Sequence, residues 1–182
     1  MQNLKEYYLY VGRLVNYKKV ELLVKTFNKL NKKLVIIGTG SRTYSLKHMA
    51  YSNIKFVGQV SDEVLIDYYK NAKALIMPQE EDFGIVAVEA QSLGVPVIAH
   101  KKGGALDTVI DNQTGILFDE QNEESLTRAI EKFDKMSFNR RTLIANAQKF
   151  SKEVFKRRLQ KALIRFVGGW GWRNASMAGF KS

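Results

Sequence analysis

Six short apolar runs recur along this chain, with segments of helical periodicity between them. Each run has the length and apolar character of a buried strand. The runs are Tyr8–Val11, Leu34–Ile37, Ile54–Val57, Ala74–Met77, Val95–Ala99 and Gly115–Phe118. Strands that alternate with helices are typical of a parallel sheet with helices packed on both faces. The sequence therefore predicts an α/β fold with a doubly wound parallel sheet.

The composition agrees with one domain of this kind. The 182 residues are 45% hydrophobic, and a chain of this length buries roughly 70% of the surface that it exposes when unfolded. There is no cysteine, which excludes disulfides, thiolate chemistry and cysteine-ligated metals and is compatible with a reducing cytoplasm. The sequence contains neither an apolar run of about 18 residues nor a signal-peptide pattern. We therefore expect a cytoplasmic location.

Two carboxylates stand eight residues apart around a Phe-Gly turn in the segment EDFGIVAVE, Glu81–Glu89. The strand before this segment closes at Pro78, and the pattern of Ile85–Leu93 predicts a helix. Residues 81–84 therefore form a loop between a strand and a helix. In an open α/β sheet, ligands bind at the carboxyl ends of the strands, and the free amides that open the next helix favour an anion. We expect this loop to face a binding site.

The two carboxylates and the loop amides suit different chemical groups. Glu81 can accept hydrogen bonds from hydroxyls, and Glu89, about a turn and a half into the helix, serves a second point roughly 6 Å further along. The backbone amides of Phe83, Gly84 and Ile85 can hold a phosphate between these points. The expected ligand is therefore a nucleoside diphosphate sugar.

The surrounding segment, PQEEDFGIVAVEAQSLGVPVIA, resembles the donor site of retaining GT-B glycosyltransferases of the glycosyl transferases group 1 type, and EDFGIVAVE matches their E-x7-E motif. The resemblance implies that Glu81 contacts the hydroxyls of the transferred sugar and that Glu89 holds the ribose. It also implies that the backbone of Phe83, Gly84 and Ile85 approaches sugar and phosphate. Without the flanking matches, the two acids would be interpreted as surface residues near a helix start.

A second matching segment, YLYVGRL, ends a strand at Gly12 and is followed by Lys18 and an amphipathic helix, Val20–Leu30. It resembles the family's G-R-L-x3-K segment, which implies that Gly12 lines the donor site and that Arg13 and Lys18 bind the diphosphate. Arginine offers a planar fork for this task and lysine a point charge. The alternative is that both are solvated surface cations in a basic chain.

A glycine pair, Gly103 and Gly104, follows the fifth apolar run. Glycines permit a backbone to approach a ligand closely, and the pair resembles the family's G-G-x-x-E loop, with Asp107 in place of the glutamate. An ordinary tight turn is the alternative. Gly58, just after the third run, belongs by resemblance to the loop that lines the base pocket.

By the same resemblance, Arg13, Lys18 and Glu81 are the expected catalytic residues. The departing diphosphate gains negative charge, which the two cations and the helix amides can stabilise. The sequence has no Asp-x-Asp motif and no paired histidine ligands, so we expect neither a metal nor a cofactor. His48 is expected at the surface and His100 at a strand end near the site.

GT-B enzymes close two Rossmann-like domains around their substrates, and the resemblance covers one of them. It assigns residues 1–166 to a single nucleotide-sugar-binding Rossmann-like domain, half of a GT-B fold, and leaves 167–182 as an irregular tail. The expected partner is an N-terminal acceptor-binding domain, which Met1–Glu6 cannot encode. Alone, the chain is expected to bind donor but to turn over poorly.

The function that the resemblance implies is transfer of a sugar, with retention, from a nucleoside diphosphate to a glycan or a lipid-linked acceptor. The segments EEDFGIVAVEAQ and GGALDTVIDNQTG resemble polysaccharide mannosyltransferases more than sucrose or glycogen enzymes. GDP-mannose is therefore the first choice of donor, and polysaccharide biosynthesis is the expected process.

Two other functions stay open. One keeps the fold but makes the chain a non-catalytic nucleotide-sugar-binding module. The other follows from the net charge of +11, which favours nucleic acid or an anionic membrane surface. The densest basic run, Lys149–Arg165, has an apolar helical face and is expected to be a packing helix with a solvated basic side. We therefore expect no nucleic acid, whereas peripheral contact with lipid at the inner face of the membrane would suit a lipid-linked acceptor.

Overall fold

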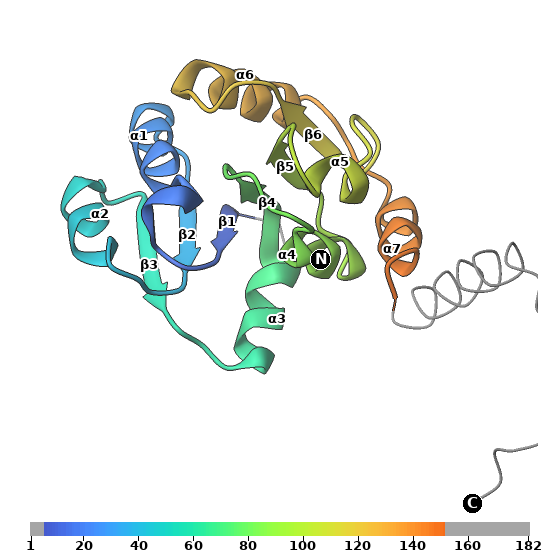
Figure 1. The fold of residues 1–182 in the computed structure, drawn as a ribbon, viewed down its shortest axis with the longest axis horizontal. Coiled ribbons are helices and arrows are strands. Elements are labelled where there is room, and N and C mark those ends of the chain that lie inside the picture. The colour runs from blue at the N-terminus through green and yellow to red at the C-terminus, as the bar shows by residue number, and fades with distance from the viewer. Residues whose placement is uncertain (1–5, 152–182) are drawn as a thin grey trace, which may run out of the picture. The chain divides into compact units, whose positions relative to one another are not determined.

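The predicted strands form one parallel sheet in the computed structural model, which describes residues 6–151 (Figure 1). The strands are β1 (Tyr7–Val11), β2 (Leu34–Ile37), β3 (Ile54–Gly58), β4 (Ala72–Met77), β5 (Val97–His100) and β6 (Gly115–Phe118). Their order across the sheet is β3-β2-β1-β4-β5-β6, and every neighbouring pair is parallel. The prediction of a doubly wound parallel sheet is confirmed.

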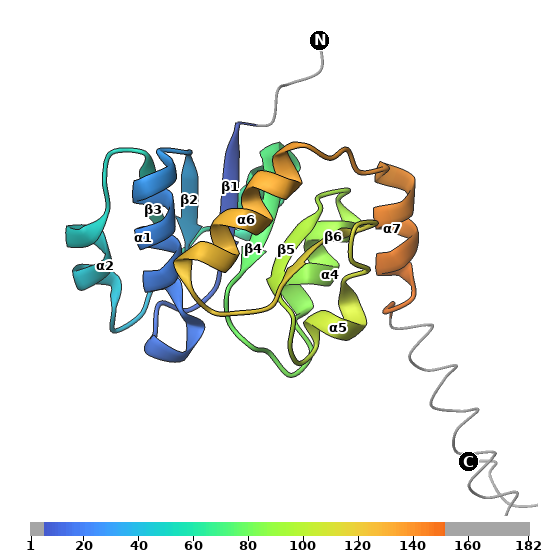
Figure 2. The same cartoon turned by 90° about the horizontal axis from the view of Figure 1, so that it is seen from above.

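Helices connect the strands and cover both faces of the sheet. They are the short 3-10 helix η1 (Asn16–Lys18), α1 (Val20–Leu30), α2 (Thr43–Met49), α3 (Asp62–Asn71), α4 (Ile85–Ser92), α5 (Ala105–Thr108), α6 (Glu123–Asp134) and α7 (Arg140–Gln148). Figure 2 shows α1 and α6 together on one face. Buried residues of α1, α2 and α6 form one apolar cluster with the sheet, and those of α3, α4 and α5 form the other.

Successive strand residues point to opposite faces of the sheet and therefore belong to two separate hydrophobic cores. Tyr8 and Tyr10 of β1 belong to the cluster under α1 and α6, whereas Leu9 between them belongs to the cluster under α3 and α4. Every residue of β2 and of β5 is buried. A strand covered on both faces appears in the sequence as an uninterrupted apolar run, which explains why the strands were predictable.

The borders of some elements differ from the prediction by a few residues. The fifth strand begins at Val97, not at Val95, because the amide of Val95 donates a hydrogen bond of 2.9 Å to the Ala90 carbonyl and thereby closes the end of α4. Elsewhere the border is sharp: α3 begins at Asp62 directly after Ser61, and its first turn carries Asp62 and Glu63, where the helix dipole favours negative charge. These shifts leave the strand ends that carry the expected site in place.

The chain divides into two compact units, Met1–Ala147 and Gln148–Ser182. The structure describes the second unit only at Gln148–Ser151. Most of the predicted basic helix Lys149–Arg165, the predicted domain boundary at Phe166 and the predicted tail lie outside the described residues. No helix among the described residues is long and apolar enough to cross a membrane.

Candidate functional site

The candidate site lies where the winding of the chain reverses. β1 and β4 are neighbours in the sheet, but α1, which follows β1, packs on one face and α4, which follows β4, packs on the other. The loops after these two strands therefore diverge at the carboxyl edge of the sheet. In open α/β sheets, ligands bind at this topological switch point.

Lys18 and Glu81 meet at this point. Lys18 ends η1 in the connection after β1, and Glu81 stands in the loop after β4, 63 residues further along the chain. The Lys18 ammonium contacts Oε1 of Glu81 directly, and the two side chains are only 14% and 23% exposed. Partial burial strengthens the attraction relative to an ion pair in open solvent. The fold thus brings together two of the three side chains for which the sequence predicts a catalytic role.

Gln79, the second residue after β4, also holds Glu81. Its side chain is 2% exposed, and its Nε2 donates a hydrogen bond of 2.7 Å to Oε1 of Glu81. Tyr10 is the other neighbour that sequence analysis missed, since burial, followed by the negative charge of Glu81, raises the pKa of its hydroxyl. The position of an amide directly after Pro78 at a strand end was the one signal in the sequence that pointed to Gln79.

Arg13 is exposed and forms no ion pair with the part of the chain that the structure describes. Its carbonyl accepts a hydrogen bond of 3.2 Å from the Tyr10 hydroxyl. The amide of Gly12 donates to the Ile37 carbonyl at 3.0 Å, and a Cβ atom on Gly38 would lie 2.0 Å from the Gly12 carbonyl oxygen. The close packing of the two loops fixes the backbone here and leaves the guanidinium open to a ligand.

The loop after β4 enters α4 through Gly84. This residue has φ 72°, a left-handed conformation that glycine adopts without strain. Phe83 is 46% exposed and Ile85 is 63% exposed, so the start of α4 presents unusually large apolar side chains to solvent. The structure places these three predicted donor-binding residues beside Glu81, at the entrance of α4.

Glu89 is exposed on α4 and is held by a tyrosine from α3. The hydroxyl of Tyr69 donates a hydrogen bond of 3.0 Å to Oε2 of Glu89. Tyr69 itself is 1% exposed, and burial, with the Glu89 charge as the second cause, raises its pKa. A buried and rigid donor therefore orients the second carboxylate of the EDFGIVAVE segment.

The glycine pair packs against the loop that carries Glu81. The amide of Gly104 donates a hydrogen bond of 2.6 Å to the Glu81 carbonyl. A Cβ atom on Gly103 would lie 2.3 Å from the same carbonyl oxygen, and one on Gly104 would lie 2.4 Å from that of Phe83. The close approach made by the pair in this structure is therefore to protein backbone. By contrast, Gly58 at the end of β3 has open space where its Cβ would stand.

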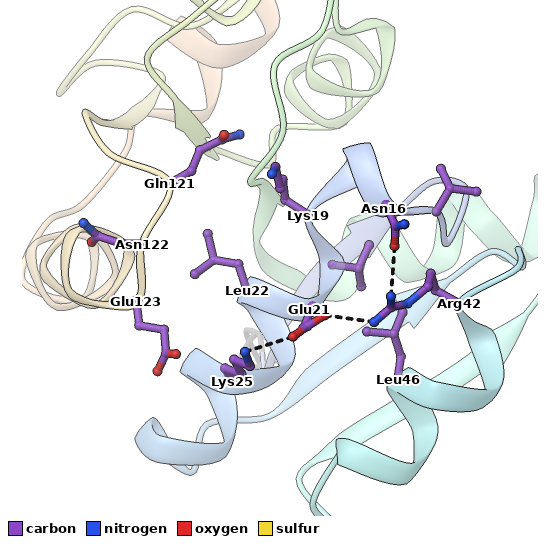
Figure 3. A pocket seen from close by; sticks show the side chains of 12 residues that line it. Asn16, Lys19, Glu21, Leu22, Lys25, Arg42, Leu46, Gln121, Asn122 and Glu123 are labelled. Carbon is purple, nitrogen blue, oxygen red and sulfur yellow. Dashed lines mark hydrogen bonds and ion pairs between the residues drawn. The ribbon is translucent and has the colours of Figure 1, made fainter.

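A groove of about 370 Å³ lies beside this site and is lined from η1, the starts of α1 and α6, and Arg42 (Figure 3). Glu21 lies within it and binds Lys25 and Arg42, each at 2.9 Å, and the bond from Lys25 is the main cause that lowers the pKa of Glu21. The lining includes Lys19 but neither Lys18 nor Glu81. The groove is therefore a neighbour of the candidate site, separate from its charged pair.

The histidines occupy the positions that the sequence predicts. His48 is exposed on α2. His100 ends β5, is 4% exposed, and has no partner at Nδ1 in the part of the chain that the structure describes. Burial is the main cause that lowers its pKa, which favours the neutral imidazole. Within the described residues, no group of three or more histidine, aspartate or glutamate side chains is arranged to hold a metal ion.

Comparisons with known proteins identify the family of this chain. Residues 2–150 match the model of the family described as glycosyl transferases group 1. The chain is 30% identical over 175 residues to the capsular polysaccharide biosynthesis glycosyltransferase CapM of Staphylococcus aureus, an alignment that covers 87% of this chain and 46% of that protein. It is also 30% identical over 138 residues to the GDP-mannose-dependent alpha-(1-6)-phosphatidylinositol monomannoside mannosyltransferase of Mycolicibacterium smegmatis, covering 66% of this chain and 36% of the relative.

Solved glycosyltransferase structures superpose on this chain. Sucrose-phosphate synthase from Thermosynechococcus elongatus superposes with a TM-score of 0.73 at 28% identity, over 90% of this chain and 46% of that one. Anabaena HepE in complex with UDP-glucose superposes with a TM-score of 0.72 at 22% identity, over 90% and 49% of the two chains, which shows a shared fold. This chain spans less than half the length of these relatives. It belongs to the glycosyl transferases group 1 family.

Proposed function

We propose that this chain supplies the donor-binding half of a retaining glycosyltransferase. The observation that carries the proposal is the contact between Lys18 and Glu81 at the topological switch point. A cation for the diphosphate and a carboxylate for the sugar hydroxyls stand side by side there, as a ligand that joins phosphate to sugar requires. The exposed Arg13 and the start of α4 add further donors for the phosphates.

In the proposed reaction, the bond between the anomeric carbon and the phosphate oxygen breaks, and its electron pair leaves with the nucleoside diphosphate. The acceptor hydroxyl oxygen bonds to the same face of the sugar, and its proton passes to the oxygen of the departing diphosphate. Lys18, Arg13 and the amides that open α4 stabilise the charge on the departing diphosphate, while Glu81 binds the sugar hydroxyls and Glu89 the ribose. These groups need no metal for charge stabilisation.

GDP-mannose is the donor that we propose first. The support is the name of the mycobacterial relative, which specifies dependence on GDP-mannose, together with the resemblance of the loop segments to mannosyltransferases. Solved structures of similar fold contain UDP-glucose or ADP, so the experiment has to compare bases directly.

The acceptor domain, the acceptor and the place of action belong to the same proposal. Since the chain covers less than half of its relatives, a second domain that reads a glycan or a lipid-linked acceptor is the proposed partner. We also propose a cytoplasmic location, and the net charge of +11 supports peripheral contact with anionic lipid at the inner face of the membrane. Vesicle sedimentation that does not depend on anionic lipid would contradict the membrane contact.

Titration calorimetry with GDP, UDP, ADP and their sugar conjugates tests the proposal. Arg13→Ala should weaken binding of every diphosphate, whereas Glu81→Ala should weaken sugar conjugates more than bare nucleotides. Lys70→Ala, which removes an exposed lysine of α3, is the matched control for loss of one positive charge. Absence of any nucleotide binding at millimolar concentration would overturn the donor-site proposal.

The alternative of a non-catalytic binding module makes one different prediction. Adding an acceptor domain in trans should produce sugar transfer if the chain is half of an enzyme. A module that binds donor would show the same calorimetric pattern but no transfer in that assay.

A further inference from the structure

We infer that Gln79 is a positioning residue that orients the Glu81 carboxylate for the sugar of the donor, an assignment that rests on the proposed function. Gln79 is 2% exposed and comes from the same loop as Glu81. Its Nε2 donates a hydrogen bond of 2.7 Å to Oε1 of Glu81. The reverse orientation of the amide would place a carbonyl oxygen against a carboxylate, so the donor must face Glu81.

The two oxygens of Glu81 have different surroundings. Oε1 receives both the Lys18 ammonium and the Gln79 amide. Oε2 has no hydrogen-bond partner among the residues that the structure describes. Lysine is a point charge on a flexible stem and can follow the carboxylate as it rotates, whereas a planar amide on a buried side chain cannot. Gln79 therefore fixes which oxygen is anchored and leaves Oε2 to accept a sugar hydroxyl.

The other end of the amide argues against a purely structural role. Oε1 of Gln79 is buried and has no hydrogen-bond partner within residues 6–151. A buried acceptor without a donor costs stability, and an apolar residue of the same shape would remove that cost. Gln79 therefore costs stability at one end of its amide and forms a hydrogen bond to Glu81 at the other. We take this as support for a role in orienting the carboxylate.

Gln79→Met, which keeps the length of the side chain and removes its polar atoms, separates these roles. We expect the variant to melt at the same temperature as wild type or higher. Binding of the preferred sugar conjugate should weaken by about tenfold, since a hydrogen bond to a charged group is worth at least that factor, and binding of the bare nucleotide should stay within twofold. The matched control is Gln121→Met. Gln121 also donates a hydrogen bond to the loop after β4, at the Pro78 carbonyl, but its replacement should not change the ratio of the two affinities.

Gln79→Glu gives a readout that a structural role would not produce. At pH 8 the introduced carboxylate repels Glu81, so the sugar conjugate should bind weakly relative to wild type at the same pH. Near pH 5 the introduced carboxyl carries a proton for more of the time, because the neighbouring carboxylate raises its pKa. It can then donate to Glu81 as the amide does, and affinity should return towards wild type. Gln79→Met should show no such recovery.

The outcomes distinguish failure of this assignment from failure of the proposed function. If wild type binds sugar conjugates and Gln79→Met binds them equally well, the positioning role is overturned and the donor site stands. Equal losses for conjugate and bare nucleotide, or a lower melting temperature that accounts for the loss, also overturn it. If wild type binds no conjugate, the proposed function is overturned and the assignment falls with it.

Discussion

The hydroxyl of Tyr8 donates a hydrogen bond of 2.6 Å to Asp134, 126 residues further along the chain. Lys32 and Lys73 bind the same carboxylate at 2.8 Å and 3.0 Å. The cluster joins β1, the loop between α1 and β2, the start of β4 and the last residue of α6. It lies at the amino edge of the sheet and ties the two central strands together at the end opposite to the candidate site.

Asp134→Asn should destabilise the fold in a manner that depends on pH. Burial opposes ionisation of Asp134, but hydrogen bonds from Lys32, Tyr8 and Lys73 outweigh it and lower the pKa to about 2. Because the folded pKa is lower than the unfolded one, the stabilisation is complete above pH 4 and disappears as the pH falls towards 2. The variant should lose roughly 2 kcal/mol of unfolding free energy at pH 7 and much less at pH 2.5. Urea denaturation checks this, with the exposed Asp67→Asn as control; a loss that is the same at both pH values would contradict it.

Gly104→Ala should damage the site through a clash with backbone. The added methyl group would meet the Phe83 carbonyl at 2.4 Å, although φ of −62° suits alanine. We expect a loss of about 1–3 kcal/mol, as for other overpacked positions, and weaker binding of donor because the loop after β4 must move. Thermal denaturation and calorimetry measure the two effects. Unchanged donor binding in Gly104→Ala would contradict the prediction.

Tyr69→Phe should weaken binding of the nucleoside diphosphate equally with and without an attached sugar. It removes the hydroxyl that donates to Glu89, which we propose to bind the ribose. The expected loss is about 0.5–1.5 kcal/mol in donor binding, the usual value of one hydrogen bond. GDP and GDP-sugars should be affected by the same factor, in contrast to the sugar-selective loss expected at Gln79. Tyr44→Phe, at a tyrosine that is 75% exposed, should bind like wild type; a loss confined to sugar conjugates would argue against a ribose contact for Glu89.

Asn146→Leu should destabilise the fold. Nδ2 of Asn146 donates to Oε1 of Gln91 at 2.7 Å and to the Thr108 carbonyl at 2.9 Å. All three residues are buried, so the change leaves the Gln91 oxygen without this donor and should cost about 1–3 kcal/mol. Chemical denaturation measures the loss. The exposed Gln113→Leu serves as the reference, and equal stability of the two variants would refute the prediction.

The fold was predictable because the sheet is parallel and covered on both faces. Strands such as β2 and β5 are buried along their whole length and therefore stand out as apolar runs. The borders were less predictable, because helix ends continue into capping bonds that no pattern records. The bond from Val95 to Ala90, which delays the fifth strand by two residues, is one of these.

The sequence predicts the charged residues of the candidate site but not the residues that hold them in place. Lys18 and Glu81 carry chemistry that a motif can signal, and the fold brings them into contact. The roles of Tyr10 and Tyr69 depend on which strands and helices are neighbours, and that arrangement is set by tertiary packing that one sequence does not reveal. For the same reason the glycine pair could be identified but its packing against the Glu81 loop could not.

Because β1 and β4 come from the two halves of the doubly wound sheet, each half contributes one charge to the Lys18–Glu81 pair. Neither half can form the pair alone. The two residues are 63 positions apart, so the chain loses conformational entropy on bringing them together before the contact stabilises the fold. The Lys18–Glu81 pair therefore forms only when β1 and β4 are paired in the sheet. The half that contains β1 supplies Lys18 and Arg13 but not the partner carboxylate, so the charge pair is a property of the complete sheet and of neither half.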